Sequence, residues 1–174
     1  EVTVASRDAT VDGISVTEGQ YLAILDGKAF AASDDLWTVL DALLQRFADD
    51  GLALVHVLRS DGAPEEDEIA ARVDAHGLEA AVWTLGCARA LGAAGRAVGR
   101  TVAVHVKVET GMGRLGIAVG EAKAFGGELK AVDGIEIRGV FYHFASADAV
   151  DTASARAQVA RFREAVAGLA AAGV

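Results

Sequence analysis

The stretch TVAVHVKVETGMGRLGI, residues 101–117, decides the fold because it resembles a β-strand running into a glycine turn. His105, Lys107 and Glu109 alternate with valines, so ionisable side chains share one face of this strand. A central strand of an open doubly wound sheet is covered by helices on both faces and is apolar throughout. In a (β/α) barrel, one strand face meets the helices and the other faces an interior whose carboxyl end holds the active site. The pattern therefore favours a barrel strand, with a solvated edge strand as the alternative.

Strand and helix patterns alternate around this stretch. Strands are expected at 52–58, 78–83, 101–108 and 135–142, and helices from Pro64 and at about 85–98, 118–131 and 152–172. The expected apolar stripe of the last helix consists of Val159, Phe162, Val166 and Leu169. This alternation with short connections indicates parallel strands joined by helices.

The first part of the chain has a different pattern. Asp12-Gly13, Glu18-Gly19 and Asp26-Gly27 are turn signals between short β-favouring runs, and Ser33 or Asp34 can cap an amphipathic helix. We therefore expect an α/β protein with two parts. Residues 1–72 would form a small α/β unit with an antiparallel hairpin, and residues 76–174 a partial (β/α) barrel of parallel strands.

Composition excludes several classes of function. The net charge of −9 argues against nucleic acid as a partner, and no apolar run approaches the ~20 residues of a membrane helix. Cys87 is the only cysteine, and His56 and His105 have no companion at metal-ligand spacing, so no metal site is expected. A cytoplasmic setting is the default. Since the chain opens with Glu1 and its only methionine is Met112, we expect it to be a segment of a longer protein.

Gly111, Gly113 and Gly116 also satisfy the G-x-G-x-x-G pattern of dinucleotide-binding turns. The strand before such a turn is normally apolar, however, whereas Lys107 and Glu109 precede this one. Dinucleotide binding is therefore the less favoured interpretation.

Two motifs carry a resemblance to a known family. VHVKVETGMGRLG, 104–116, and GVFYHFASAD, 139–148, together resemble the paired signature of alanine racemase, a fold-type III enzyme that uses pyridoxal 5′-phosphate. The similarity runs from about His76, through GLEAAVWTLGCARAL, to Val174. It implies a TIM-type barrel and the interconversion of L- and D-alanine by α-proton abstraction, an isomerase reaction that supplies D-alanine for the cell wall.

The resemblance also assigns roles to individual residues. It implies catalytic roles for Arg114 and Lys107, and cofactor binding by His143 and Arg114. Lys107 matches a barrel lysine that is often carbamylated and holds Arg114. Arg114 matches the arginine that reaches the phenolic oxygen of the cofactor and the region of the substrate carboxylate, and His143 matches the histidine that packs on the pyridine ring.

Structural roles remain open for the same residues. Lys107 could pair with Glu109, Arg114 could cap a turn, and His143 could be a hydrogen-bonded core histidine. Asp148 is expected to cap the following helix.

The chain also departs from the family. It has no asparagine, and therefore lacks the alanine-asparagine motif around the lysine that forms the Schiff base with the cofactor. The catalytic tyrosine of the partner subunit and the phosphate-binding residues are likewise absent, and Glu109 replaces the usual aspartate. We expect a segment of an alanine racemase, acting on a small-molecule amino acid in a possible homodimer, that is not competent alone.

A fainter resemblance links residues 1–60 to the C-terminal part of dihydroxyacetone-kinase-like-domain proteins, the fatty acid kinase group. A non-catalytic α/β fusion or remnant module is therefore an alternative function. Another fold-type III protein, such as the pyridoxal-phosphate homeostasis group, is a third.

Overall fold

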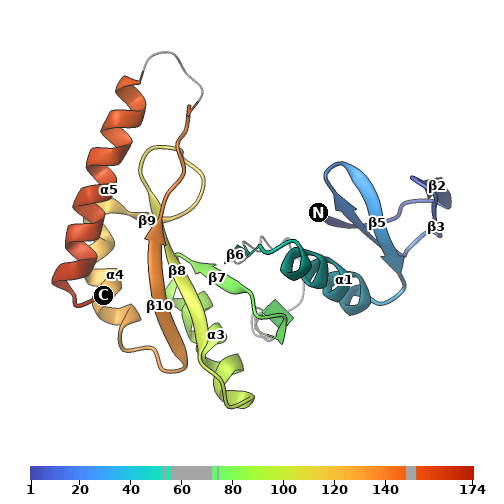
Figure 1. Cartoon of the computed structure of the whole chain (residues 1–174), viewed down its shortest axis with the longest axis horizontal. Coiled ribbons are helices and arrows are strands. Elements are labelled where there is room, and N and C mark those ends of the chain that lie inside the picture. The colour runs from blue at the N-terminus through green and yellow to red at the C-terminus, as the bar shows by residue number, and fades with distance from the viewer. Residues whose placement is uncertain (53, 56–71, 74, 148–151) are drawn as a thin grey trace. The chain divides into compact units, whose positions relative to one another are not determined.

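The chain folds into two compact units, Glu1–Ala53 and Leu54–Val174, in a computed structural model (Figure 1). The structure describes residues 1–52, 54–55, 72–73, 75–147 and 152–174. The expected boundary between 72 and 76 stays a prediction. The expected helix after Pro64, the end of the strand at 52–58 and the cap at Asp148 lie outside the described residues.

The first unit is a small antiparallel α/β unit, as the sequence predicts. Strands β1 (Val2–Val4), β4 (Tyr21–Leu25) and β5 (Lys28–Ser33) form one sheet in the order β1-β4-β5, and β2 (Ala9–Val11) pairs with β3 (Ile14–Val16). The turns at Asp12-Gly13 and Asp26-Gly27 have positive φ at both residues, which suits two-residue hairpin turns.

Helix α1 (Leu36–Asp49) packs its apolar face against this sheet. Val39 and Leu43 join Ala23 of β4 in the buried core. The expectation that Ser33 or Asp34 caps the helix is wrong: the cap is Asp35, whose carboxylate accepts hydrogen bonds from the amides of Trp37 and Thr38. Each of these side chains suits the role, so the sequence alone cannot choose among them.

The second unit is built on a parallel sheet, which confirms the expected strand arrangement. Strands β6 (Leu54–Val55), β7 (Glu79–Val82), β8 (Val102–Glu109) and β10 (Ile135–Phe141) lie in the order β10-β8-β7-β6, with all pairs parallel. A short strand, β9 (Ile117–Ala118), also pairs with β8. Because neighbouring strands run the same way, the segments after β8 and β10 emerge at one edge of the sheet.

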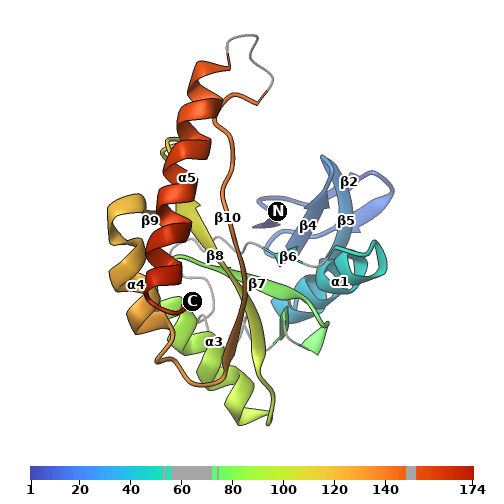
Figure 2. The ribbon, with the colours of Figure 1, turned by 60° about the vertical axis from the view of Figure 1, so that its left-hand side comes forward.

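Helices connect these strands. Helix α3 (Leu85–Ala97) follows β7 and contacts β7, β8 and β10. A 3₁₀ turn, η1 (Val119–Glu121), leads into α4 (Ala122–Leu129), so the helix expected from 118 starts later and ends earlier. Helix α5 (Ala153–Ala171) runs beside α4, as Figures 1 and 2 show.

The two faces of β8 differ as the alternating sequence predicts. Val102, Val104, Val106 and Val108 are fully buried. On the other face, His105 is partly exposed, whereas Lys107 is only 2% exposed.

The expected apolar stripe of α5 is correct at Leu169 but wrong at Val166, which is 38% exposed. The buried residues of α5 are Gln158, Ala165 and Leu169. The face is therefore rotated from the expected one, because a polar glutamine occupies a buried position that a hydrophobic pattern assigns to solvent.

Candidate functional site

The turn after β8 is organised by the carboxylate of Glu109. It accepts the backbone N–H groups of Gly111, Met112 (2.6 Å), Gly113 (2.9 Å) and Arg114 (3.2 Å). Burial alone would raise the pKa of Glu109, but these amides together hold that pKa below its ordinary value. The Glu109 carboxylate is therefore the anion that the amides of this turn bind.

This arrangement argues against the dinucleotide alternative. In a dinucleotide-binding turn, backbone amides must be available to the phosphates of the ligand. Here the amides of Gly111 and Gly113 donate to Glu109 instead. Both glycines have positive φ, 133° and 72°, a backbone conformation that glycine adopts readily.

Lys107 is a buried cation at the end of β8. Its Nζ donates a hydrogen bond to the carbonyl of Val108 (3.0 Å) and lies 5.6 Å from the centre of the Phe141 ring. Burial lowers the pKa of Lys107, the charge of Glu109 opposes that shift, and the nearby Arg114 guanidinium adds to it. The sequence leaves open an ion pair between Lys107 and Glu109. In the described part of the chain, the Glu109 carboxylate instead accepts hydrogen bonds from backbone amides.

His143 follows β10 and belongs to the same electrostatic group. Its pKa is lowered first by burial and then by the positive charges of Lys107 and Arg114. Lys107 is fixed by β8, Arg114 by the turn that follows, and His143 by the segment after β10. The structure therefore brings the three residues of the sequence prediction together at one edge of the sheet, as a group with excess positive charge.

Helix α5 contributes polar contacts that the sequence reasoning missed. Gln158 is 1% exposed and hydrogen-bonds to Thr110, to the carbonyl of His143 and to the amide of Ala145. Arg161 donates to the carbonyl of Thr110 (2.8 Å). The only signal in the sequence is their spacing of three residues, which places both on one helix face.

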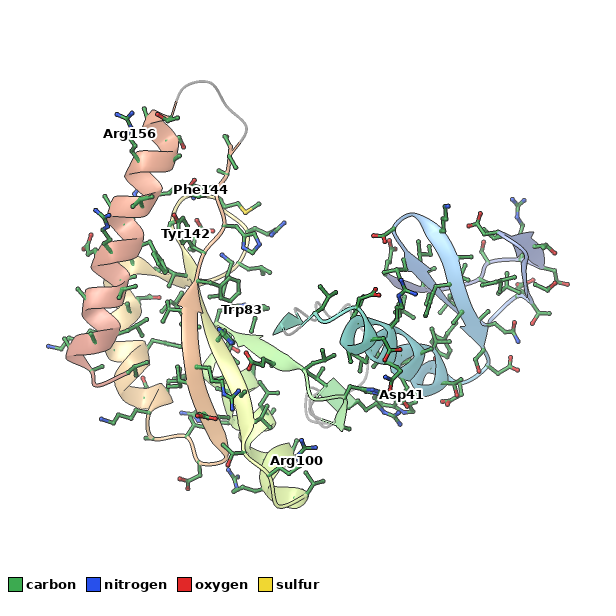
Figure 3. All side chains as sticks on the ribbon, viewed as in Figure 1. Asp41, Trp83, Arg100, Tyr142, Phe144 and Arg156 are labelled. Atoms are coloured by element: carbon green, nitrogen blue, oxygen red, sulfur yellow. The ribbon has the colours of Figure 1, made fainter. Side chains whose placement is uncertain are left out.

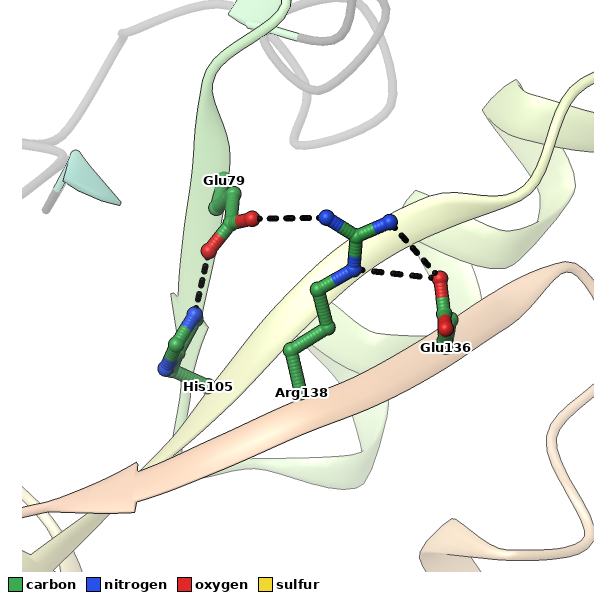
Figure 4. Close-up of polar contacts among 4 residues, drawn as sticks. All are labelled: Glu79, His105, Glu136 and Arg138. Carbon is green, nitrogen blue, oxygen red and sulfur yellow. Dashed lines mark hydrogen bonds and ion pairs between the residues drawn. The ribbon is translucent and has the colours of Figure 1, made fainter. Parts of the chain in front are cut away.

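A second polar group surrounds His105, which precedes Lys107 in β8 (Figure 4). Glu79 of β7 bonds to Nε2 of His105 and accepts a hydrogen bond from Arg138 (3.1 Å), and Arg138 also pairs with Glu136 (3.1 Å). Bonding to His105 is the main reason why the pKa of Glu79 is lowered. This network links β7, β8 and β10 on the face that carries Lys107.

Neither a metal site nor a membrane-spanning helix is found among the described residues. Among them, no cluster of His, Cys, Asp or Glu side chains could hold a metal ion. None of their helices is both long and apolar enough to cross a membrane.

Known proteins similar to this chain are alanine racemases. The family model "Alanine racemase, N-terminal domain" matches residues 39–174, beginning well before His76. The alanine racemase of Syntrophobacter fumaroxidans is 45% identical over 93 residues, covering 53% of this chain and 25% of the relative. That of Symbiobacterium thermophilum is 44% identical over 98 residues, covering 56% of this chain and 26% of the relative. The chain thus spans about a quarter of the length of these curated relatives.

Solved structures agree with the sequence relatives. The alanine racemase of Clostridium difficile 630 in complex with cycloserine matches with a TM-score of 0.65 at 26% identity, covering 77% of this chain and 36% of that one. The enzyme from D-cycloserine-producing Streptomyces lavendulae gives 0.63 at 26% identity, covering 77% and 35%. The second unit is accordingly part of a TIM-type barrel. Since the family model covers most of the chain, the chain belongs to the alanine racemase N-terminal domain family.

Proposed function

We propose that this chain supplies one side of an alanine racemase active site, formed by Lys107, Arg114 and His143. The observation that carries the proposal is the grouping of these side chains at the carboxyl edge of a parallel sheet, where burial and then the charges of Lys107 and Arg114 lower the pKa of His143. In barrel enzymes, this edge is where chemistry takes place. The substrate would be a small amino acid.

The residues fit one part of pyridoxal 5′-phosphate. Anionic oxygens of the cofactor or of an amino acid carboxylate suit this group, because Lys107 and Arg114 carry two positive charges and Glu109, whose charge acts on Lys107, offsets only one of them. In the second unit, Lys123 and Lys130 are exposed on α4 and at its end. The resemblance implies a covalent lysine within an alanine-asparagine motif, which this chain lacks, so that lysine would come from elsewhere.

Each side chain has a physical role in this proposal. When bound, the cofactor supplies a conjugated ring that delocalises the charge left by removal of the α proton. The planar guanidinium of Arg114 would hold an anionic oxygen through directed hydrogen bonds. Because its pKa is lowered, the imidazole of His143 stays neutral at physiological pH, so it can pack on an aromatic ring without adding another charge.

Lys107 would hold Arg114 only after a change of charge, because two cations repel. The lowered pKa of Lys107 increases the fraction of neutral amine, which is the form that attacks carbon dioxide. The reaction forms a nitrogen–carbon bond, releases one proton and leaves a carbamate. The negative carbamate would attract Arg114, which converts a repulsive pair into a supporting one.

Binding of a cofactor analogue tests the proposal. Pyridoxine 5′-phosphate has the ring and phenolic oxygen of the cofactor but no aldehyde, so it cannot react with lysines. We expect saturable binding by calorimetry, and Arg114→Lys should weaken it about tenfold because the guanidinium fork is lost. Arg156→Lys, an exposed position on α5, is the matched control and should bind as the original chain does.

Two results would contradict this proposal. Absence of saturable binding would favour the non-catalytic α/β module, and equal weakening by both arginine variants would remove Arg114 from the site. Racemisation of alanine by the chain alone is not expected, because the chain lacks the alanine-asparagine motif around the cofactor-binding lysine that the resemblance implies.

The setting of the enzyme is also part of the proposal. We place the enzyme in the cytoplasm as a homodimer, because the resemblance implies a catalytic tyrosine that the partner subunit supplies. D-alanine for the cell wall would be the product. Analytical ultracentrifugation of the chain tests the dimer.

A further inference from the structure

We propose that Gln158, supported by Arg161, is a positioning residue of this site. We name the pair the loop clamp, because from α5 it holds together the turn after β8 and the segment after β10. The catalytic meaning of the clamp rests on the proposed function, whereas the clamp itself is a structural relationship that can be tested without cofactor.

The contacts of Gln158 join two segments that are far apart in sequence. Its Nε2 donates to Oγ1 of Thr110 (2.9 Å) and to the carbonyl of His143 (3.0 Å), and its Oε1 accepts from the amide of Ala145 (2.9 Å). Both amide hydrogens and the oxygen of the glutamine are therefore used. Each partner lies within a few residues of Arg114 or His143.

The clamp begins where the strand ladder ends. The last paired residues of β8 and β10 are Lys107 and Phe141, so the segments beyond them are no longer joined by ladder hydrogen bonds. Gln158 bridges them at Thr110 and His143. The separation between the Arg114 turn and the histidine is thus set by a side chain of the helix.

Helix α5 is suited to this task because its two ends have different contacts. Towards its C-terminus, Leu169 packs against Gly126 of α4, where an added Cβ would lie 3.0 Å from a Leu169 methyl group. Towards its N-terminus, the same helix carries Gln158 and Arg161. Figure 3 labels Arg156, Tyr142 and Phe144 at this same end of the unit.

Gly111 of the turn leaves space for the side chains of the loop clamp. A Cβ at this position would lie 2.8 Å from a terminal nitrogen of Arg161 and 3.7 Å from Cγ of Gln158. Gly111 also has a φ of 133°, a backbone conformation that residues with a side chain rarely adopt. The glycine therefore lets Arg161 reach the carbonyl of Thr110.

Gln158→Met tests the clamp in the full chain, because methionine has similar length but cannot form these hydrogen bonds. By nuclear magnetic resonance, we expect roughly tenfold faster hydrogen exchange of the Ala145 amide, which loses its acceptor. The pKa of His143 should also rise towards its ordinary value, as the segment becomes less buried and moves away from Lys107 and Arg114. Thr110→Val, which removes one acceptor only, should give a smaller change in the same direction if Gln158→Met does not fold.

Leu169→Ala is the matched control on the same helix. It removes packing between α5 and α4 and should lower stability, while the His143 titration and the Ala145 exchange stay as in the original chain. The clamp is refuted if Gln158→Met and Thr110→Val leave both signals unchanged, or if Leu169→Ala moves them equally. Because no cofactor is present, failure of pyridoxine 5′-phosphate to bind would leave these results intact.

Discussion

Gly139 lies beside His105 in the parallel β8–β10 ladder, and it leaves the space that the imidazole ring occupies. A Cβ at this glycine would lie 2.6 Å from Nδ1 of His105, whose Nε2 is held by Glu79. We therefore expect Gly139→Ala to lower the free energy of unfolding by about 1–3 kcal/mol, as measured by denaturant titration. Gly127→Ala in α4, where nothing lies within 4 Å of the added carbon, should instead stabilise by up to about 1 kcal/mol. A neutral effect of Gly139→Ala would show that His105 can move.

Glu109 predicts an acid-sensitive turn. Its pKa is lowered in the folded chain, so its contribution to stability is present above its unfolded pKa and is lost as pH falls through the folded value. Glu109→Gln should cost about 1 kcal/mol at pH 7, and the difference from the original chain should shrink below about pH 4. Exposed Glu164→Gln is the control and should show no such dependence. A pH-independent difference would mean that the amides do not depend on the charge of Glu109.

Lys107 predicts a conflict between stability and function. Its lowered pKa means that the folded state holds the proton less tightly than the unfolded state does. The charged amine therefore destabilises the folded chain fully below the folded pKa, and this destabilisation is relieved as pH rises towards about 10. Lys107→Met should raise the free energy of unfolding by about 1 kcal/mol at pH 7, with a smaller gain at pH 10, while weakening any carbamate-dependent binding. Lys123→Met, on the exposed face of α4, should change stability by less than about 0.5 kcal/mol. Destabilisation by Lys107→Met at both pH values would contradict this account.

The Glu79–His105 pair predicts a measurable coupling. A double-mutant cycle with Glu79→Gln and His105→Gln should give about 1 kcal/mol at pH 7, because both side chains are about four-fifths buried. The pKa of Glu79 is lowered, so the coupling should be lost as pH falls through that lowered value. The exposed Arg89–Glu128 pair, 3.7 Å apart, should give a coupling near zero in the same type of cycle. Equal couplings for the two pairs would be the opposite outcome.

Periodicity predicted the parallel core of this protein because its strands and helices are regular. The alternation in β8 correctly separated buried valines from the face that carries Lys107. The same alternation could not say that Lys107 would be buried, since that depends on neighbours such as Phe141 that are distant in sequence.

Side-chain partnerships explain what the sequence reasoning missed. Gln158 resembles a solvent-facing residue of an amphipathic helix, and its burial is possible only because two loops provide hydrogen-bond partners. The sequence shows Glu109 as a carboxylate near the site, but the hydrogen bonds that it accepts from the following amides depend on the geometry of the turn. The kinase resemblance of residues 1–60 and the roles of the site residues stay predictions.

The hydrogen bonds between Glu109 and the amides of its own turn affect how a ligand would be attracted to this site. The backbone amides of this turn that could bind an anion already donate to Glu109, so attraction is left to the side-chain charges of Lys107 and Arg114. Such attraction is screened by dissolved salt, with a range of about 8 Å under physiological conditions. Ligand capture at this edge of the sheet should therefore weaken steeply in concentrated electrolyte, whereas the shape of the turn itself should persist.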